Sequence, residues 1–260
     1  MTTHGLRTGS WIVAALVLCG SLARPGVARA EQITVLCSNG FKAVLQDLAP
    51  RFEKATKHEV VIRYSVSAEL KRRIEGGESF DVAILTPGLI EDLIKTRRIT
   101  ADSRAPLARS GFALAIRRGA QKPDVRTVEA LKATLLASRS IAFAKEGSGG
   151  VYLMALLEKL ALTEQMTPKF KPTTTGDDVS QAVARGEAEL GVLPLSEILP
   201  VPGVEVAGTF PADIQDYSVM VAGVGTAAAH SAAARALIEF LTSPAALPVI
   251  QQKGMERASR

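Results

Sequence analysis

Short apolar runs alternate with segments of helical periodicity along most of the chain. Runs that favour β-strands occupy residues 33–36, 60–64, 80–85, 111–117, 140–144, 188–193 and 216–222. Between the first two runs, apolar residues recur three or four positions apart at Val44, Leu45, Leu48 and Phe52, a spacing typical of an amphipathic helix. Strands that alternate with helices predict an α/β fold with mixed, largely parallel sheets and helices on both faces.

The same periodicity predicts helices over residues 41–56, 68–75, 89–95, 127–138, 151–162, 177–186, 232–242 and 244–253. The glycine-rich segment 147–150 is expected to form a loop before the helix at 151–162. Strands near Ser110 and Tyr217 are expected to make two hinge crossings between two lobes. We expect residues 31–109 and 218–260 to form the first lobe and residues 110–217 the second, with a cleft between them.

The first thirty residues predict an export signal that is not part of the fold. Arg7 precedes an apolar run at residues 11–23, and Ala28-Arg29-Ala30 supplies the small-residue pattern at which signal peptides are cleaved. The run is shorter than the ~20 apolar residues of a membrane-spanning helix, and a retained membrane anchor is the alternative. We expect cleavage after Ala30 and a periplasmic protein that begins at Glu31.

Charge and cysteine content change once this signal is set aside. Residues 1–30 hold three of the 31 basic residues and none of the 26 acids, so 28 basic and 26 acidic residues remain. This near balance, with aromatic residues at only 5% of the chain, gives no reason to expect nucleic acid as a partner. Cys37 is the one cysteine left, and its place at the end of an apolar run predicts a buried thiol.

Motifs of known catalytic and metal sites are absent from the sequence. It holds no H-E-x-x-H, C-x-x-C or G-x-S-x-G pattern, and the segment 147–150 matches neither a P-loop nor a dinucleotide fingerprint. The adjacent acids Asp177 and Asp178 stand before a predicted helix and are interpreted as helix caps. We therefore expect no metal, no cofactor and no catalytic group.

Two strand-like runs end in short turns that carry hydroxyl groups and lead into predicted helices. The turns are Cys37-Ser-Asn-Gly40 and Ser65-Val-Ser67. The first N–H groups of a helix lack partners within the helix, and the helix dipole favours negative charge at that end. Two such ends directed at one cleft predict a binding site for a small anion, formed without a metal or a lysine.

Eight short sequence segments occur in a characteristic order along the chain. They are ITVL at 33–36, LQDLA at 45–49, SVS at 65–67, IEGGESFDV at 74–82, GGVY at 149–152, DV at 178–179, GEAELG at 186–191 and VAGTFP at 206–211. This set resembles the periplasmic molybdate-binding protein family, which belongs to the type 2 periplasmic solute-binding proteins of ABC transporters. The resemblance implies two lobes that close on an oxyanion held by hydroxyl groups and backbone amides. It also implies an ABC transporter permease as partner, and we expect a monomer without stable membrane insertion.

The resemblance also implies ligand positions. Ser67 matches a serine ligand of the family, and a simple N-cap of the helix at 68–75 is its structural alternative. Gly149, which follows Ser148, and Val179 match positions whose backbone amides bind the ligand. For each of these positions, a turn residue without ligand contact is the alternative.

The first turn and the end of the strand at 188–193 depart from the family's pattern. Gly40 stands where molybdate binders carry a serine, and Ser38 and Asn39 either supply donors from a shifted position or cap the next helix. Pro194 stands where the family's ligand tyrosine falls, and proline offers neither a hydroxyl nor an N–H. Tyr217 either projects into the cleft from the crossing strand or is a buried hinge aromatic.

These departures make a small carboxylate as acceptable as an oxyanion such as molybdate, with Arg73 or Lys145 as candidate charge partners. We expect an exported solute-binding protein, not an enzyme, that captures a small anion for an ABC transporter. One alternative is an exported lyase or hydrolase that acts on a small acid in the same cleft. Another is a binding protein that feeds a membrane sensor.

Overall fold

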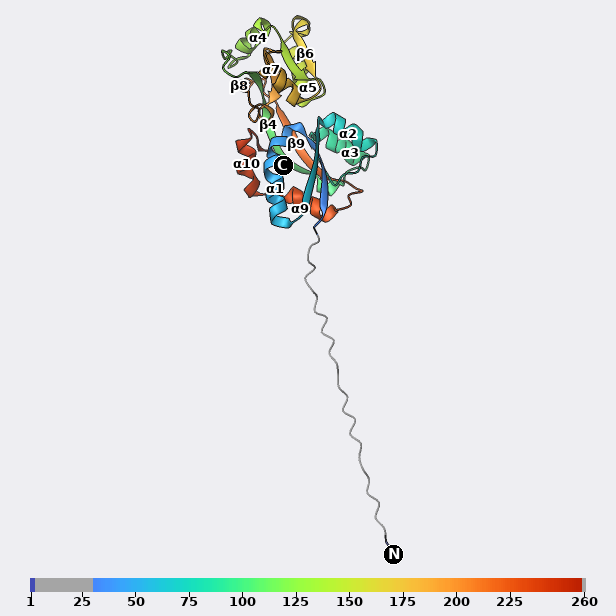
Figure 1. The fold of residues 1–260 in the computed structure, drawn as a ribbon. Coiled ribbons are helices and arrows are strands. Elements are labelled where there is room, and N and C mark those ends of the chain that lie inside the picture. Colours follow the sequence, from blue (N-terminus) through green and yellow to red (C-terminus); the bar gives the residue numbers. More distant parts are fainter. Residues whose placement is uncertain (3–29, 259–260) are drawn as a thin grey trace.

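The computed structural model describes residues 1, 2 and 30–258 of the 260-residue chain. The predicted signal peptide therefore lies almost wholly outside the described residues. The described chain forms two α/β halves that share strand β4 (Ala105–Arg117) and lie end to end (Figure 1).

The first half combines elements from both ends of the chain. Besides the first part of β4, it holds β1 (Gln32–Ser38), α1 (Asn39–Thr56), β2 (Glu59–Ser65), α2 (Ser67–Glu75), β3 (Val82–Leu85), α3 (Pro87–Lys95), the 3-10 helix η1 (Ala101–Ser103), β9 (Tyr217–Val224), α9 (Ser231–Thr242), η3 (Pro244–Ala246), α10 (Leu247–Gln252) and β10 (Glu256–Arg257).

The second half is continuous in sequence. Besides the end of β4, it holds α4 (Val128–Ala137), β5 (Ile141–Ala144), α5 (Ser148–Lys159), α6 (Thr163–Met166), η2 (Thr167–Lys169), β6 (Phe170–Thr173), α7 (Gly176–Ala184), β7 (Leu190–Pro194), α8 (Leu195–Ile198) and β8 (Val204–Thr209).

The strands of both halves form one sheet, in the order β2-β1-β3-β9-β4-β7-β5-β6, and β8 and β10 also pair with β4. β1 pairs in parallel with β2 and β3, and β5 with β6 and β7. β4 and β9 run antiparallel to their neighbours. The expected α/β fold, a mixed sheet with helices on both faces, is confirmed.

β4 joins the two halves. Its residues 105–111 pair with β9, and its residues 112–117 pair with β7 and β8. The chain returns between β8 and β9, where the Phe112 N–H donates to the Asp216 carbonyl at 3.2 Å. Two segments of chain therefore pass between the halves, and the lobe limits at residues 109/110 and 217/218 stay a prediction.

Each half packs apolar residues on both faces of its part of the sheet. In the first half, α1 buries Phe41, Leu45 and Phe52 against one face, and α2 and α3 cover the other. The second half repeats this arrangement with α5 on one face and α7 on the opposite one. Cys37 lies fully buried in the first of these cores, which confirms the expected buried thiol, and burial raises the pKa of that thiol.

No single helix among the described residues is long and apolar enough to cross a membrane. The helix α9 and the segment Pro244–Gln252 together meet the criteria of length and composition, with a bend of 59° between them. In the structure, α9 packs Ala234, Leu237 and Leu241 into the core of the first half.

Two predicted elements differ from the structure. The segment 147–150 is not a loop, because α5 begins at Ser148 and the two following glycines lie in its first turn. The helix predicted at 244–253 is divided into η3 and α10. Strands β6 and β8 were not predicted, because their residues are at most partly buried apart from Val204 and form no apolar run.

The interpretation of the acid pair as helix caps holds for one of its members. Thr175 is the N-cap of α7, and Asp178 completes a capping box in which its carboxylate accepts a hydrogen bond from the Thr175 N–H at 2.9 Å. Asp177 instead pairs with Lys42 of α1 at 2.5 Å.

Candidate functional site

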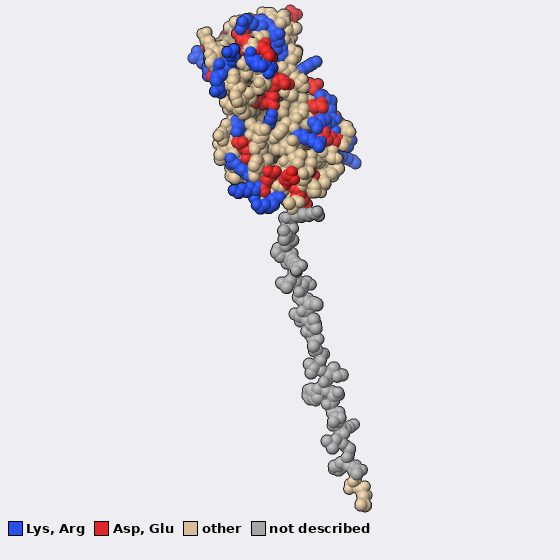
Figure 2. All heavy atoms as spheres, viewed as in Figure 1, with Lys and Arg blue, Asp and Glu red and all other residues tan. Residues whose placement is uncertain are grey.

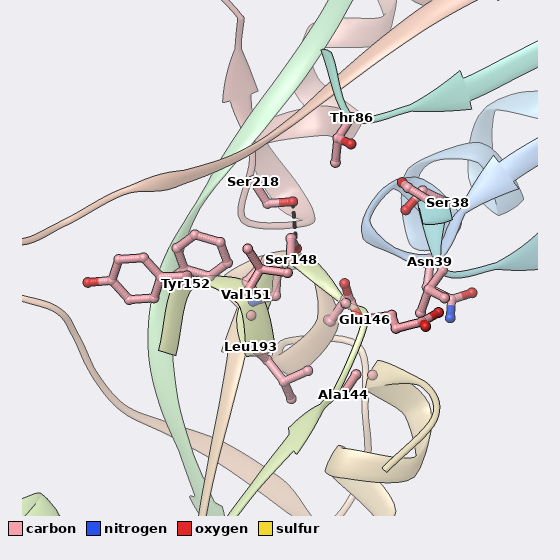
Figure 3. Close-up of a pocket in the computed structure, with 18 of the residues that line it drawn as sticks. Ser38, Asn39, Thr86, Ala144, Glu146, Ser148, Val151, Tyr152, Leu193 and Ser218 are labelled. Atoms are coloured by element: carbon pink, nitrogen blue, oxygen red, sulfur yellow. Dashed lines mark hydrogen bonds between the residues drawn. The ribbon is translucent and has the colours of Figure 1, made fainter. Parts of the chain in front are cut away.

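A cavity of about 530 Å³ lies between the two halves (Figure 3). The helices that follow β1, β2, β3 and β5 all begin at its wall, because the carboxyl ends of these strands face the junction of the halves. The polar residues that line it are Ser38, Asn39, Ser67, Thr86, Glu146, Ser148, Glu197, Asp216, Tyr217 and Ser218.

Four of the helices that begin at this wall lack side-chain caps. The N-cap residues of α1, α2, α3 and α5 make no side-chain hydrogen bond to their helices; they are Ser38, Val66, Thr86 and Gly147. By contrast, threonine side chains cap α4 and α7, and α7 also begins at the cavity wall, at Gly176. The uncapped first turns leave N–H groups open to a ligand, and helix dipoles add positive potential at the same place.

Ser67 is the clearest single donor in this wall. It is the first residue of α2, it is 8% exposed, and its buried Oγ has no hydrogen-bond partner among the described residues. A buried hydroxyl without a partner is costly unless a ligand or water completes it. Because Val66 is the N-cap, the alternative of Ser67 as a simple cap finds no support in the structure.

Ser38 and Asn39 lie beside Ser67 in the same wall, and both are largely buried. Ser38 takes the N-cap position of α1 without forming a cap hydrogen bond, so its hydroxyl is not consumed by the helix. Thr86, which is not among the predicted ligand residues, faces the cavity from the start of α3 (Figure 3).

Ser148 and Gly149 line the cavity from the second half, in the first turn of α5. The Ser148 hydroxyl is hydrogen-bonded to the Ser218 hydroxyl of β9 at 3.0 Å (Figure 3). A Cβ on Gly149 would lie 2.6 Å from the Val192 carbonyl oxygen, so glycine is required there for the helix to approach β7.

Two of the predicted ligand residues do not line the cavity. The Gly40 carbonyl accepts a hydrogen bond from Ser196 Oγ, and Gly40 packs beside Met220. The Val179 N–H donates to the Thr175 carbonyl at 3.2 Å, and the Val179 side chain is fully buried in the second half. The amide of Val179 is therefore occupied within its own helix.

Tyr217 is 38% exposed and lines the cavity at the start of β9. The guanidinium of Arg109 lies 4.3 Å from its ring centroid. The interpretation of Tyr217 as a buried hinge aromatic is therefore wrong, and its ring is accessible from the cavity.

One wall of the cavity is apolar. Phe112 stacks on Tyr152 with ring centroids 4.5 Å apart, and the Tyr152 hydroxyl donates to the Ile214 carbonyl. Figure 3 shows Val151, Tyr152 and Leu193 across the cavity from Ser38, Asn39 and Thr86. The cavity thus sets hydrogen-bond donors opposite carbon surface.

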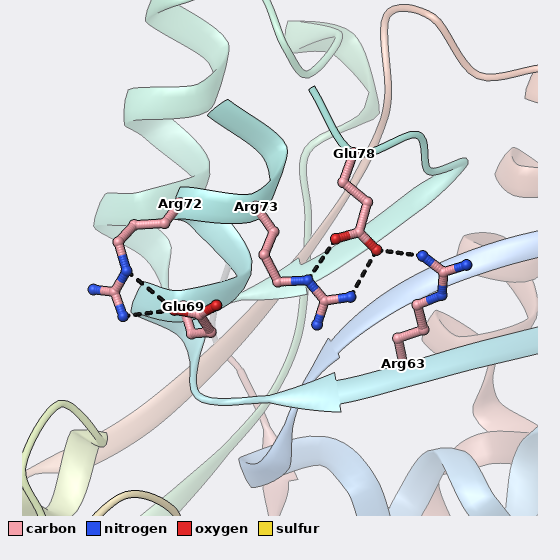
Figure 4. A network of polar contacts seen from close by, with 5 residues as sticks. All are labelled: Arg63, Glu69, Arg72, Arg73 and Glu78. Atoms are coloured by element: carbon pink, nitrogen blue, oxygen red, sulfur yellow. Dashed lines mark hydrogen bonds and ion pairs between the residues drawn. The ribbon is translucent and has the colours of Figure 1, made fainter. Parts of the chain in front are cut away.

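The charged residues in the described cavity wall are the acids Glu146, Glu197 and Asp216, and no lysine or arginine lines that wall. Neither candidate charge partner lines it. Arg73 forms an ion pair with Glu78, with 2.5 Å between Nε and Oε2 (Figure 4), and Lys145 lies outside the wall. Figure 2 shows basic and acidic side chains interspersed on the face in view.

Glu197 was missed by sequence reasoning. It lies in the four-residue helix α8, directly after β7, at the point where α1 and α7 begin. Burial raises the pKa of its carboxyl to about 7; the neighbouring Asp177 charge adds to the rise and Lys42 opposes it. Its position after the carboxyl end of a strand was the available sequence signal.

Two ion pairs connect the halves at the edges of the cavity. Lys42 of α1 pairs with Asp177 of α7 at 2.5 Å, and Arg72 of α2 pairs with Glu146 at 2.7 Å. These side chains are solvent-accessible, so each pair contributes at most about 1 kcal/mol. They mark the surfaces that face each other across the cavity.

The chain is similar in sequence to a family of bacterial binding proteins. Residues 33–256 match the family model described as bacterial extracellular solute-binding protein. The chain is 32% identical over 230 residues to an aconitate isomerase of Pseudomonas sp., covering 86% of this chain and 87% of the relative. It is 29% identical over 231 residues to the molybdate-binding protein ModA of Azotobacter vinelandii, covering 87% and 90%.

Solved structures agree on the fold. The periplasmic molybdate-binding protein of Azotobacter vinelandii superposes with a TM-score of 0.76 at 22% identity, covering 87% of this chain and all of that one. The sulfate-binding protein SubI of Mycobacterium tuberculosis H37Rv gives 0.72 at 17% identity, with 88% of each chain covered. The type 2 periplasmic binding protein fold is thereby confirmed, and the chain belongs to the bacterial extracellular solute-binding protein family.

Proposed function

We propose that this solute-binding protein captures a small polycarboxylate anion in the cavity between its halves. The observation that carries the proposal is the opposition of two walls. The uncapped starts of α1, α2 and α3, with the hydroxyl-bearing residues there, form one wall, and Phe112, Val151 and Tyr152 form part of the other. Carboxylate oxygens suit the first wall, and a carbon skeleton suits the second.

A tetrahedral oxyanion fits this cavity less well. Such an ion presents oxygen in every direction, so it gains nothing from the apolar wall and loses hydration there. Pro194 also lines the cavity, and it brings neither a hydroxyl nor an N–H to the ligand. One relative is named for an organic acid and the others for molybdate, and the apolar wall favours the organic acid.

As in other members of this family, we expect the ligand to pass to an ABC transporter permease, with delivery to a membrane sensor as the alternative. The binding step itself gains from closure of the halves, because excluding water strengthens charge-assisted hydrogen bonds to the anion. We expect the periplasm as the compartment of this protein, because the structurally similar molybdate-binding protein of Azotobacter vinelandii is periplasmic.

The test is a thermal-shift panel on the purified protein. We expect cis-aconitate, trans-aconitate or citrate to raise the melting temperature, because a ligand at a hundredfold excess over its Kd stabilises the native state by about 2.7 kcal/mol. Molybdate, tungstate, sulfate and phosphate serve as the matched anions without a carbon skeleton. Stabilisation by molybdate alone would contradict the proposal.

A second candidate function is isomerisation of an unsaturated polycarboxylate. Glu197 favours it, because a carboxyl in the cavity wall with a pKa near 7 can accept a proton from one carbon and return it to another. The relative named aconitate isomerase adds support. Incubating cis-aconitate with the protein in D₂O and following the trans isomer by NMR tests this activity. A bound but unchanged ligand would leave capture alone as the function.

A further inference from the structure

We propose that Glu197 binds the ligand as a carboxylic acid, so that each captured anion brings one proton into the cavity. The inference rests on the proposed capture of a polycarboxylate. It adds that the Glu197 carboxyl contacts the ligand and must be protonated to do so. In this role the Glu197 O–H donates a hydrogen bond to a ligand carboxylate, which compensates for the absence of a cation in the described wall.

The Glu197 carboxyl lies in a confined space between the two halves. An added Cβ on Gly176 would lie 1.7 Å from Glu197 Oε2, and one on Gly40 would lie 3.6 Å from Oε1. The carboxyl group therefore occupies the space between the first turns of α7 and α1, one from each half. It lines the cavity between the halves and also a smaller groove that contains Lys42 and Asp177.

The cation whose charge acts on this carboxyl is already engaged. Lys42 Nζ lies 2.5 Å from Asp177 Oδ2 and forms no hydrogen bond to Glu197 among the described residues. Those two groups are the charges that face Glu197 from α1 and α7.

The strands packed against α8 place their charges elsewhere. β4 carries Arg109, which pairs with Glu256 at 2.7 Å, and Arg117, which lies at the end of the strand opposite Val204. On β8, Glu205 accepts a hydrogen bond from the Gly119 N–H. β7 carries no titratable side chain. The surroundings of Glu197 therefore offer no free positive charge to hold it as an anion beside an anionic ligand.

The other two acids of the wall are compensated in different ways. Glu146 pairs with Arg72, and exposed Asp216 accepts a hydrogen bond from the Tyr217 N–H at 2.7 Å. The Glu197 carboxylate has no hydrogen-bond donor among the described residues. Bringing a further anion next to it adds like charge in a cavity that loses water, and both effects favour the protonated form.

Ligand affinity is expected to fall as pH rises above 7. The pKa of Glu197 is about 7 without ligand, and the bound anion raises it further, so binding takes up a proton above pH 7. Affinity is then highest below pH 7 and falls as pH rises, by up to about tenfold per pH unit. A polycarboxylate is fully ionised in this range and contributes little to that slope.

The experiment is titration calorimetry with trans-aconitate between pH 7.5 and 9, in two buffers of different ionisation enthalpy. We expect close to one proton taken up per bound ligand at pH 8.5 and a matching fall in affinity. Glu197→Gln keeps a donor but cannot titrate, so its affinity should be independent of pH. Glu187→Gln, a change at an exposed surface ion pair with Arg185, should keep the slope of the unmodified protein.

The two possible failures are distinct. If trans-aconitate binds without proton uptake, or if Glu197→Gln retains the slope, the role of Glu197 is overturned while capture of a carboxylate stands. If trans-aconitate and the other polycarboxylates of the thermal-shift panel do not bind at any pH, the proposed function fails and this inference fails with it.

Discussion

Replacing Ser67 by alanine is expected to weaken polycarboxylate binding ten- to a hundredfold without lowering the free energy of unfolding. A hydrogen bond from a hydroxyl to a charged group contributes about 1.5–3 kcal/mol, and each 1.4 kcal/mol is about a tenfold change in Kd. Ser67 lines the cavity, and its buried Oγ has no partner among the described residues, so we expect the ligand to supply one.

Ser67→Ala is also expected to leave the free energy of unfolding unchanged or to raise it. In the ligand-free protein a buried oxygen without a partner costs free energy, so removing Ser67 Oγ relieves that cost. Alanine also has a higher helix propensity than serine at the start of α2. Urea unfolding without ligand should therefore show a midpoint equal to or above that of the unmodified protein.

Ser138→Ala is the matched control. Ser138 is 5% exposed, and its hydroxyl donates to the Leu135 carbonyl at 2.7 Å, at the end of α4 and outside the cavity wall. Its loss should lower stability by about 1 kcal/mol and leave ligand affinity unchanged. Full affinity in Ser67→Ala, measured by titration calorimetry, would remove Ser67 from the site.

The fold could be predicted because its signals are local. The apolar runs of β1, β2 and β3 and the periodicity of α1 lie within short windows, and their alternation alone indicates an α/β arrangement. The turns at Ser38 and Ser67 were likewise visible, because each follows a strand and opens a helix. The structure places both residues in one cavity wall.

The rest of the candidate site depends on contacts between distant parts of the chain. The pair Ser148 and Ser218 is separated by 70 positions and meets only because β9 returns to the first half beside the junction. Glu197 belongs to a helix too short to produce a periodic pattern, and its environment comes from α1 and α7. The periodicity of the sequence contains no information about contacts between residues so far apart.

Charge partners were misjudged for a related reason. Arg73 follows the Ser67 turn by six positions and seemed close to the anion site, but α2 directs its side chain to Glu78 (Figure 4). Two ion pairs join Glu78 to Arg63 and Arg73, so the cluster neutralises itself beside the sheet. Distance along the sequence did not indicate which face of the helix the guanidinium occupies.

Replacing Gly150 by alanine is expected to destabilise the protein by about 2–3 kcal/mol and to weaken ligand binding as well. An ideal Cβ at this position would lie 2.0 Å from the Ala144 carbonyl oxygen and 3.1 Å from a ring carbon of Phe143. The carbonyl is backbone in β5 and cannot turn aside, so α5 must shift away from the sheet. The shift moves Ser148 and the first N–H groups of α5 out of the cavity wall.

Gly88→Ala provides the same chemical change without the clash. Gly88 lies in the first turn of α3, and a Cβ there would meet nothing within 4 Å. Alanine should stabilise this position by about 0.4–1 kcal/mol, because it restricts the unfolded chain. The difference between the two variants in urea unfolding therefore isolates the cost of overpacking at the junction of β5 and α5. Equal stability of the two would mean that α5 approaches β5 less closely than the structure shows, and the donors at its start would then have to reach the ligand from a different position.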